Sequence, residues 1–178
     1  HSISVIHRYI KLEHIYLNID LEKKGQGNWL EVVIGCLGEA KICSQTQENG
    51  INSEIIFDAD HADTIDSFGS PDYCPKEMKI GDEQSRSLLT QDYYAFGVVA
   101  LEVLLMKKFT RPNMTDVGDL REKQNKLYLG EITKNSDELG PLAPLLEDLL
   151  YIPDTGEVYT DILQKRREAF EEIGVFAR

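Results

Sequence analysis

The sequence contains four side chains that could be considered as ligands of a zinc ion. They are two of the four histidines, His14 and His61, and two of the three cysteines, Cys36 and Cys43. Imidazole nitrogens and thiolates are the ligands that zinc prefers in structural sites. The spacings of these four residues match no zinc finger or ribbon pattern. The sequence also contains no G-x-S-x-G motif, no H-E-x-x-H motif and no Gly-rich phosphate loop. We therefore expect core or loop thiols and no metal site.

His14 also ends a longer pattern near the start of the chain. Residues 7–14 read His-Arg-Tyr-Ile-Lys-Leu-Glu-His, which resembles the catalytic loop H-R-D-x-x-x-x-N of protein kinases. In that family the Asp orients and deprotonates the substrate hydroxyl, and the Asn holds a magnesium ion. Tyr9 stands at the Asp position and His14 at the Asn position.

Three further segments resemble kinase landmarks, in the order that the family has them. Residues 32–41 resemble the strand and turn that end in D-F-G, residues 69–77 the G-T-P-E-Y-x-A-P-E run, and residues 92–102 the central helix D-V-Y-x-F-G-V-x-L-x-E. The chain, residues 1–178, is therefore identified as similar to the C-terminal lobe of a Ser/Thr protein kinase. The family's N-terminal lobe, with its Gly-rich loop and strand Lys, is not part of this sequence.

The resemblance implies that the positions needed for phosphoryl transfer are replaced. A phenol is protonated at neutral pH, so Tyr9 cannot orient a hydroxyl as a carboxylate does. Cys36, at the D-F-G Asp position, is a soft ligand that binds magnesium poorly, and His14 prefers zinc or copper. Since the base and both metal ligands have changed, we expect a degenerate pseudokinase without conventional activity, and no ATP or magnesium as cofactor.

Two residues of the catalytic-loop pattern are retained, and each has two interpretations. In the family, the residue matching Lys11 contacts the transferred phosphate, but we favour the interpretation that Lys11 is a solvated or salt-bridged lysine left from ancestry. The residue matching Arg8 can form a fork with a phosphorylated activation-segment residue, whereas the alternative is that Arg8 hydrogen-bonds loop carbonyls. The candidate phosphorylation sites are Thr64, Ser67 and Ser70.

Other matching positions have structural roles in the family. Asp92 resembles the buried Asp that accepts backbone hydrogen bonds from the catalytic loop. His7 and Leu37, together with Asp92, resemble a stack that ties this loop to the lobe. The remaining framework positions are Gly38, Gly97 and Glu77, and the usual arginine partner of Glu77 is missing from residues 155–160.

Tyr16 falls where a small aliphatic residue forms the floor under adenine in the family. A tyrosine is bulkier, and its ring would fill part of such a pocket. The alternative is that the ring tilts away into the core. The sequence favours the first arrangement only slightly.

Bulk properties indicate one globular domain and exclude some partners. The chain has 178 residues, a net charge of −12 and 42% hydrophobic residues. An acidic domain repels phosphate backbones, so we expect no nucleic-acid partner. No apolar run reaches the ~18 residues that span a bilayer. Three cysteines are too few for a disulfide framework, so we expect an intracellular, cytoplasmic protein.

Hydrophobic periodicity predicts a mainly α fold of the α+β class with one small hairpin. Residues 2–6 are expected to end a helix, and residues 15–19 and 29–34 to form the two strands of the hairpin. The activation-segment equivalent, residues 36–77, contains a long acidic loop at about 44–68 that we expect to be mobile. Helices are expected at residues 87–107, 119–129, 142–150 and 159–170.

These expectations favour a catalytically inactive lobe that acts as a protein-binding scaffold or an allosteric regulator. The expected partner is another protein, either an active kinase or a large assembly. Two alternatives stay open. One is a divergent Ser/Thr protein kinase that still binds ATP and phosphorylates proteins when complete, and the other is a structural component of a larger assembly.

Overall fold

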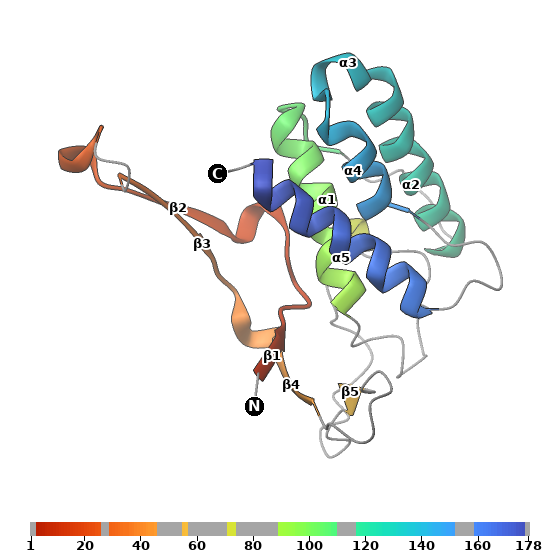
Figure 1. Ribbon diagram of the computed structural model, residues 1–178, viewed down its shortest axis with the longest axis horizontal. Helices are drawn as coiled ribbons and strands as arrows, with labels where there is room; N and C mark the ends of the chain where they lie inside the picture. The colour runs from red at the N-terminus through yellow and green to blue at the C-terminus, as the bar shows by residue number, and fades with distance from the viewer. Residues whose placement is uncertain are drawn as a thin grey trace.

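In the computed structural model of this chain, the described residues are 3–25, 29–45, 55–56, 71–73, 89–109, 117–151 and 159–176. Within them the protein is mainly helical, with a small antiparallel hairpin (Figure 1). The helices are α1 (Leu89–Leu104), α2 (Val117–Lys134), α3 (Ser136–Leu139), α4 (Leu142–Leu149) and α5 (Tyr159–Phe176). The expected α+β class is confirmed at this level.

The strands form two separate sheets. Strands β2 (Ile15–Ile19) and β3 (Leu30–Ile34) pair as the hairpin. Strand β4 (Lys41–Gln45) lies between β1 (Ile3–Ile6) and β5 (Ile55–Ile56) in an antiparallel sheet. The described residues also contain short 3-10 turns. Turn η1 (Leu12–His14) precedes β2, η2 (Leu21–Lys23) follows it, η3 (Leu37–Glu39) precedes β4, and η4 (Pro71–Tyr73) lies between β5 and α1 in the chain.

Most of the expected elements are present, and one is wrong. The four expected helices correspond to α1, α2, α4 and α5, with α2 and α5 longer than predicted. Residues 2–6 do not end a helix, because residues 3–6 form strand β1. The segment carries β-branched side chains, and its backbone groups pair with β4. Part of the expected acidic loop, at residues 44–45 and 55–56, is strand, and the rest of it lies outside the described residues.

Helix α1 is the centre of the core, as its apolar sequence predicts. Its buried residues Tyr94, Val98 and Leu101 pack in one cluster with buried leucines of α4. Gly97 permits the close approach of these two helices, because a Cβ at that position would lie 2.9 Å from the Cβ of Leu149. The structural role expected for Gly97 therefore has a steric basis.

The β2–β3 hairpin projects away from helices α1–α5 (Figure 1). The segment before it, residues 7–14, runs along α1 and connects β1 to the hairpin. Among the described residues, no helix combines the length and the apolar character that crossing a bilayer requires.

Candidate functional site

The site is built around Asp92, near the start of α1. Its Oδ2 accepts a hydrogen bond of 2.6 Å from the backbone N–H of His7, and its Oδ1 one of 2.8 Å from that of Arg8. The neighbouring Gln91 donates from Nε2 to the Arg8 carbonyl at 3.1 Å. The backbone hydrogen bonds predicted for Asp92 are therefore present, and they fasten residues 7–8 to the central helix.

This attachment holds an unfavourable backbone conformation. Arg8 has a φ of 67°, in the left-handed region, which costs a non-glycine residue on the order of 1 kcal/mol or more. Two hydrogen bonds, from the Arg8 N–H to Asp92 and from the Gln91 amide to the Arg8 carbonyl, fix both backbone groups of Arg8 and so compensate for this strain. Burial raises the pKa of Asp92, although the two N–H donors oppose that rise. The Arg8 side chain is buried as well.

His7 connects the same turn to the end of β3. Its Nδ1 accepts a hydrogen bond of 3.2 Å from the backbone N–H of Tyr9. Because Nδ1 accepts, the ring proton is on Nε2, which donates to the Gly35 carbonyl at 2.8 Å. The ring is buried. The His7 side chain therefore connects residues 7–9 to Gly35, the residue that follows β3.

Tyr9 and His14, at the two altered catalytic-loop positions, contact each other. The His14 Nδ1 lies 2.9 Å from the Tyr9 carbonyl, and the two ring centroids are 4.5 Å apart in an edge-on arrangement. The Tyr9 hydroxyl accepts a hydrogen bond of 3.3 Å from Lys11 Nζ. His14 is buried, and its carbonyl accepts a 2.9 Å hydrogen bond from the Gly35 N–H. Both side chains therefore stabilise the loop that carries them.

Cys36 and Tyr16 form the exposed side of the site. The Cys36 backbone is left-handed, with a φ of 62°, and its Sγ lies 3.9 Å from the Tyr16 hydroxyl. The hydrogen bond to Cys36 raises the pKa of Tyr16. Gly35 makes room for this ring, since a Cβ there would lie 2.5 Å from Tyr16 Cε2. Tyr16 is 51% exposed, so the alternative that its ring tilts into the core is wrong.

Two expected framework roles are not found. Leu37 is 61% exposed at the start of η3, so it does not form a buried stack with His7 and Asp92. The loop is tied to α1 by its hydrogen bonds to Asp92 and by the packing of Ile10 and Leu12 against the core, and Leu37 takes no part in this attachment. Gly38 has no steric requirement, because an added Cβ would meet no atom within 4 Å. Glu77 and the candidate phosphorylation sites Thr64, Ser67 and Ser70 lie outside the described residues.

The metal ligands considered from the sequence are not brought together in the part of the chain that the structure describes. Among those residues, no group of three or more His, Cys, Asp or Glu side chains could hold a metal ion. Cys43 lies in β4, and His61 lies outside the described residues.

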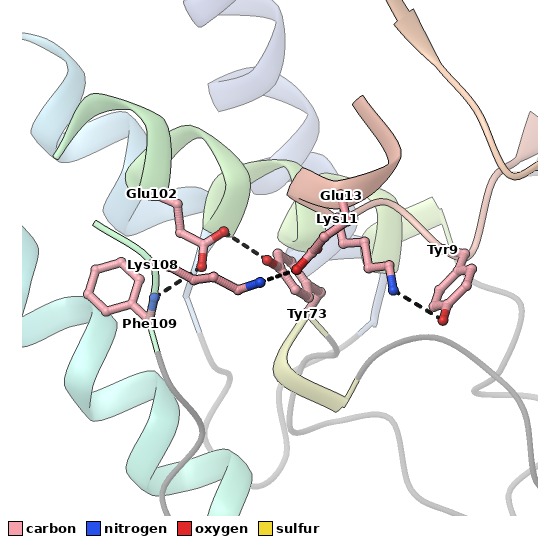
Figure 2. A network of polar contacts seen from close by, with 7 residues as sticks. All are labelled: Tyr9, Lys11, Glu13, Tyr73, Glu102, Lys108 and Phe109. Atoms are coloured by element: carbon pink, nitrogen blue, oxygen red, sulfur yellow. Dashed lines mark hydrogen bonds and ion pairs between the residues drawn. The ribbon is translucent and has the colours of Figure 1, made fainter. Parts of the chain in front are cut away.

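A second polar network, at the other end of α1, was missed by the sequence analysis (Figure 2). Glu102 is buried and accepts hydrogen bonds from the Tyr73 hydroxyl at 2.8 Å and from the Phe109 N–H at 3.1 Å. Burial, followed by the hydrogen bond to Glu102, raises the pKa of Tyr73, and burial raises that of Glu102. Nearby, Lys108 forms an ion pair with Glu13. The signal for this network was the carboxylate of Glu102, which interrupts the apolar second half of α1.

A buried arginine was also missed. Arg166 on α5 has no exposed surface, and its Nη2 donates to the Tyr151 carbonyl at 2.6 Å. The guanidinium carbon lies 5.2 Å from the ring centroid of Tyr94. Its sequence neighbours Lys165 and Arg167 are partly exposed and form ion pairs, so charge alone did not distinguish Arg166 from a surface residue.

No protein-family model matches the chain, and a search of curated proteins found no match. The assignment of the site therefore depends on its residues and their geometry.

Proposed function

We propose that the chain is a degenerate, protein-kinase-like C-terminal lobe that serves as a protein-binding scaffold or allosteric regulator. One observation carries the proposal. The backbone of residues 7–8 is held by Asp92, while the neighbouring base and metal positions carry Tyr9, His14 and Cys36. An intact attachment beside replaced chemistry is the arrangement expected when a fold is retained for its shape.

The local contacts support a loss of phosphoryl transfer. The Tyr9 hydroxyl accepts a hydrogen bond from Lys11, so the retained lysine is engaged within the loop. The Nδ1 of His14 is engaged by the Tyr9 carbonyl, and the Cys36 thiol lies beside Tyr16. Neither His14 nor Cys36, at the two proposed metal positions, supplies the hard oxygen ligand that magnesium requires. In this proposal the partner is another protein, with an active kinase as the family-level analogy.

The experiment measures nucleotide and metal binding by the purified protein in its complete form, because the alternative is a kinase that binds ATP when complete. We expect no magnesium-dependent change in melting temperature with ATP, and no transfer of radiolabelled γ-phosphate to protein substrates. Magnesium-dependent phosphate transfer that disappears in the Lys11→Ala variant would instead establish the divergent-kinase alternative.

A reversion series tests the reason for inactivity. The triple variant Tyr9→Asp, His14→Asn and Cys36→Asp restores a carboxylate at the base position and oxygen ligands at the two metal positions. We expect it to bind manganese more tightly than the natural chain, as followed by electron paramagnetic resonance of the free ion. The matched control is the same triple variant with Tyr9→Asn in place of Tyr9→Asp, which keeps the size of the new side chain but removes its charge. Equal manganese binding by the natural chain and the reverted chain would contradict the proposed loss of ligands.

A further inference from the structure

Helix α2 presents a basic face on an acidic chain. The structure describes the side chains of its residues 123–134, and six of these residues are exposed: Lys123, Lys126, Leu127, Gly130, Thr133 and Lys134. At about 100° of rotation per residue, the six fall within one arc of about 120°. The buried side chains Tyr128 and Ile132 lie in the core on the opposite side of the helix. We call the six exposed residues the α2 face.

The charge of this part of α2 is opposite in sign to that of the whole chain. Residues 123–134 contain three lysines and one glutamate, a formal charge of +2, whereas the whole chain carries −12. The glutamate, Glu131, is outside the α2 face, and its carboxylate lies 2.9 Å from the Nζ of Lys107. The α2 face itself contains no acidic residue. It therefore attracts carboxylates on a protein that otherwise repels them.

The centre of the α2 face has no packing role within the described chain. Leu127 is 37% exposed, and a Cβ added at Gly130 would meet no neighbouring atom within 4 Å. Glycine in the interior of a helix is less favourable than alanine, and here no close contact within the chain requires it. A position without a side chain beside an exposed leucine permits a side chain from outside to approach the helix closely. The apolar centre is therefore suited to an external partner.

The length of the α2 face selects a short partner. Lys123 and Lys134 are eleven positions apart, which corresponds to about 16 Å along the helix. Beyond Lys134 the exposed side chains become acidic again, at Asp137 and Glu138 in α3. A nucleic-acid strand or a lipid surface would extend past this boundary and be repelled by the acidic residues. An acidic segment of a protein can end within it.

We infer that the α2 face is a docking surface for an acidic segment of a partner protein. The three lysines meet carboxylates of the partner, and Leu127 and Gly130 receive a small or aliphatic side chain between them. The inference rests on the protein-binding role proposed above, to which it adds a surface and the chemistry of the partner. Helix α2 lies across the helical body from the β2–β3 hairpin (Figure 1).

Fluorescence anisotropy of a labelled peptide with the complete protein tests the inference. The probe is a helical peptide of about 12 residues with glutamates on one face and alanines elsewhere, and the matched probe has glutamine in place of glutamate. We expect only the glutamate peptide to bind, with an affinity that falls as salt is added, because salt screens exposed charge pairs. Equal binding of the two peptides overturns the inference. Binding of phosphatidylserine vesicles or of an oligonucleotide, without binding of the glutamate peptide, overturns it as well.

Charge reversal tests whether the peptide binds at α2. The double variant Lys126→Glu and Lys134→Glu is expected to weaken binding of the glutamate peptide by about ten-fold or more. The matched control is the double variant Lys23→Glu and Lys24→Glu, which changes the net charge equally at two exposed positions that follow β2. Equal losses in the two double variants would mean that net charge alone governs binding, and would overturn the inference.

Gly130→Ala separates binding from folding. The added methyl group is expected to weaken binding of the glutamate peptide by about three-fold, although the melting temperature rises because alanine favours the helix. A raised melting temperature with unchanged affinity overturns the close contact at Gly130. Absence of both peptide binding and phosphate transfer overturns this inference alone, whereas magnesium-dependent phosphate transfer contradicts the proposed function whatever the peptide does.

Discussion

Residues 7–14 and the β2–β3 hairpin follow each other in the chain, yet the structure treats them in opposite ways. The first segment is fastened to α1 because Asp92 accepts hydrogen bonds from two of its backbone N–H groups and Gln91 donates one to a backbone carbonyl. The hairpin is far more apolar, but it projects from the body and contacts the core only at its base. The more hydrophobic of the two segments is therefore the more exposed one.

The difference follows from where each segment finds partners for its backbone. The hairpin satisfies its inner N–H and C=O groups by its own ladder, so only its side chains still need a covering surface. The turn at residues 7–8 has no ladder, and its N–H groups depend on a carboxylate from a distant helix. Residues 7–14 are held in place both by these backbone hydrogen bonds and by the packing of Ile10 and Leu12 against the core.

The largest expected effect comes from removing that carboxylate. Asp92→Ala leaves the N–H groups of His7 and Arg8 buried without an acceptor. Each unsatisfied group costs about 1–3 kcal/mol, so the free energy of unfolding should fall by about 2–5 kcal/mol in urea titrations followed by circular dichroism. The hairpin control, Val33→Thr, should change it by less than about 0.5 kcal/mol. Comparable losses in the two variants would remove the contrast between the segments.

The sequence allowed the attachment to be predicted, because Asp92 and residues 7–14 match a known pattern at corresponding positions. Helix α4 was also predictable, since its leucines recur with helical spacing and it follows Pro141. Strand β1 was not, because four residues are too few for a period to separate helix from strand. Its partner β4 lies some forty positions along the chain, and that pairing has no local signal.

Burial of single polar residues was the other property that the sequence did not reveal. Glu102 interrupts an apolar run, but its donors Tyr73 and Phe109 come from different segments. Leu37 is exposed although its residue type predicts burial. The hairpin strands were predicted, but the exposure of their aliphatic side chains, such as Leu17 and Val32, depends on tertiary packing. The burial or exposure of single residues arises from tertiary packing, and no periodic pattern in the sequence indicates it.

The second-largest expected effect concerns the hydrogen bonds of Glu102. It tests whether they contribute to the free energy of unfolding as the hydrogen bonds of Asp92 do. Tyr73→Phe removes the hydroxyl that donates to the buried Glu102 carboxylate. Hydrogen bonds to charged groups contribute about 1.5–3 kcal/mol, and the free energy of unfolding should fall by that amount. A double-mutant cycle with Glu102→Gln checks the assignment, because the two losses should not be additive. Full additivity would mean that the two side chains act independently.

A pair of glycine substitutions tests whether the α1–α4 contact excludes added volume that an open position in α2 accepts. Gly97→Ala places a methyl group 2.9 Å from the Leu149 Cβ and should destabilise the chain by about 1–3 kcal/mol. Gly130→Ala, in α2, meets no atom within 4 Å and should stabilise it by about 0.5–1 kcal/mol through helix propensity. Thermal unfolding of both variants measures the difference. A shift of the same sign in both would contradict the close α1–α4 contact.

The smallest expected effect is a dependence of stability on pH. Burial raises the pKa of Asp92 and of Glu102 above their ordinary values of 3.8 and 4.5, so both carboxyls bind a proton more tightly in the folded chain. The stabilisation that this tighter proton binding gives to the folded chain is complete at pH values below the ordinary pKa values. It is lost as the pH rises through the raised pKa values of the folded chain. The free energy of unfolding should therefore increase as pH falls from neutral toward those values.

Two surface ion pairs act in the opposite direction. Lys108 lowers the pKa of Glu13, and Lys107 lowers that of Glu131, so acid weakens both pairs. These pairs are partly exposed and are screened by salt, whereas the two buried carboxyls are not. Urea titrations across the acidic range at high salt should isolate the buried groups. Glu102→Gln should then flatten part of the pH dependence, and an unchanged slope would mean that Glu102 is charged as readily in the folded chain as in the unfolded one.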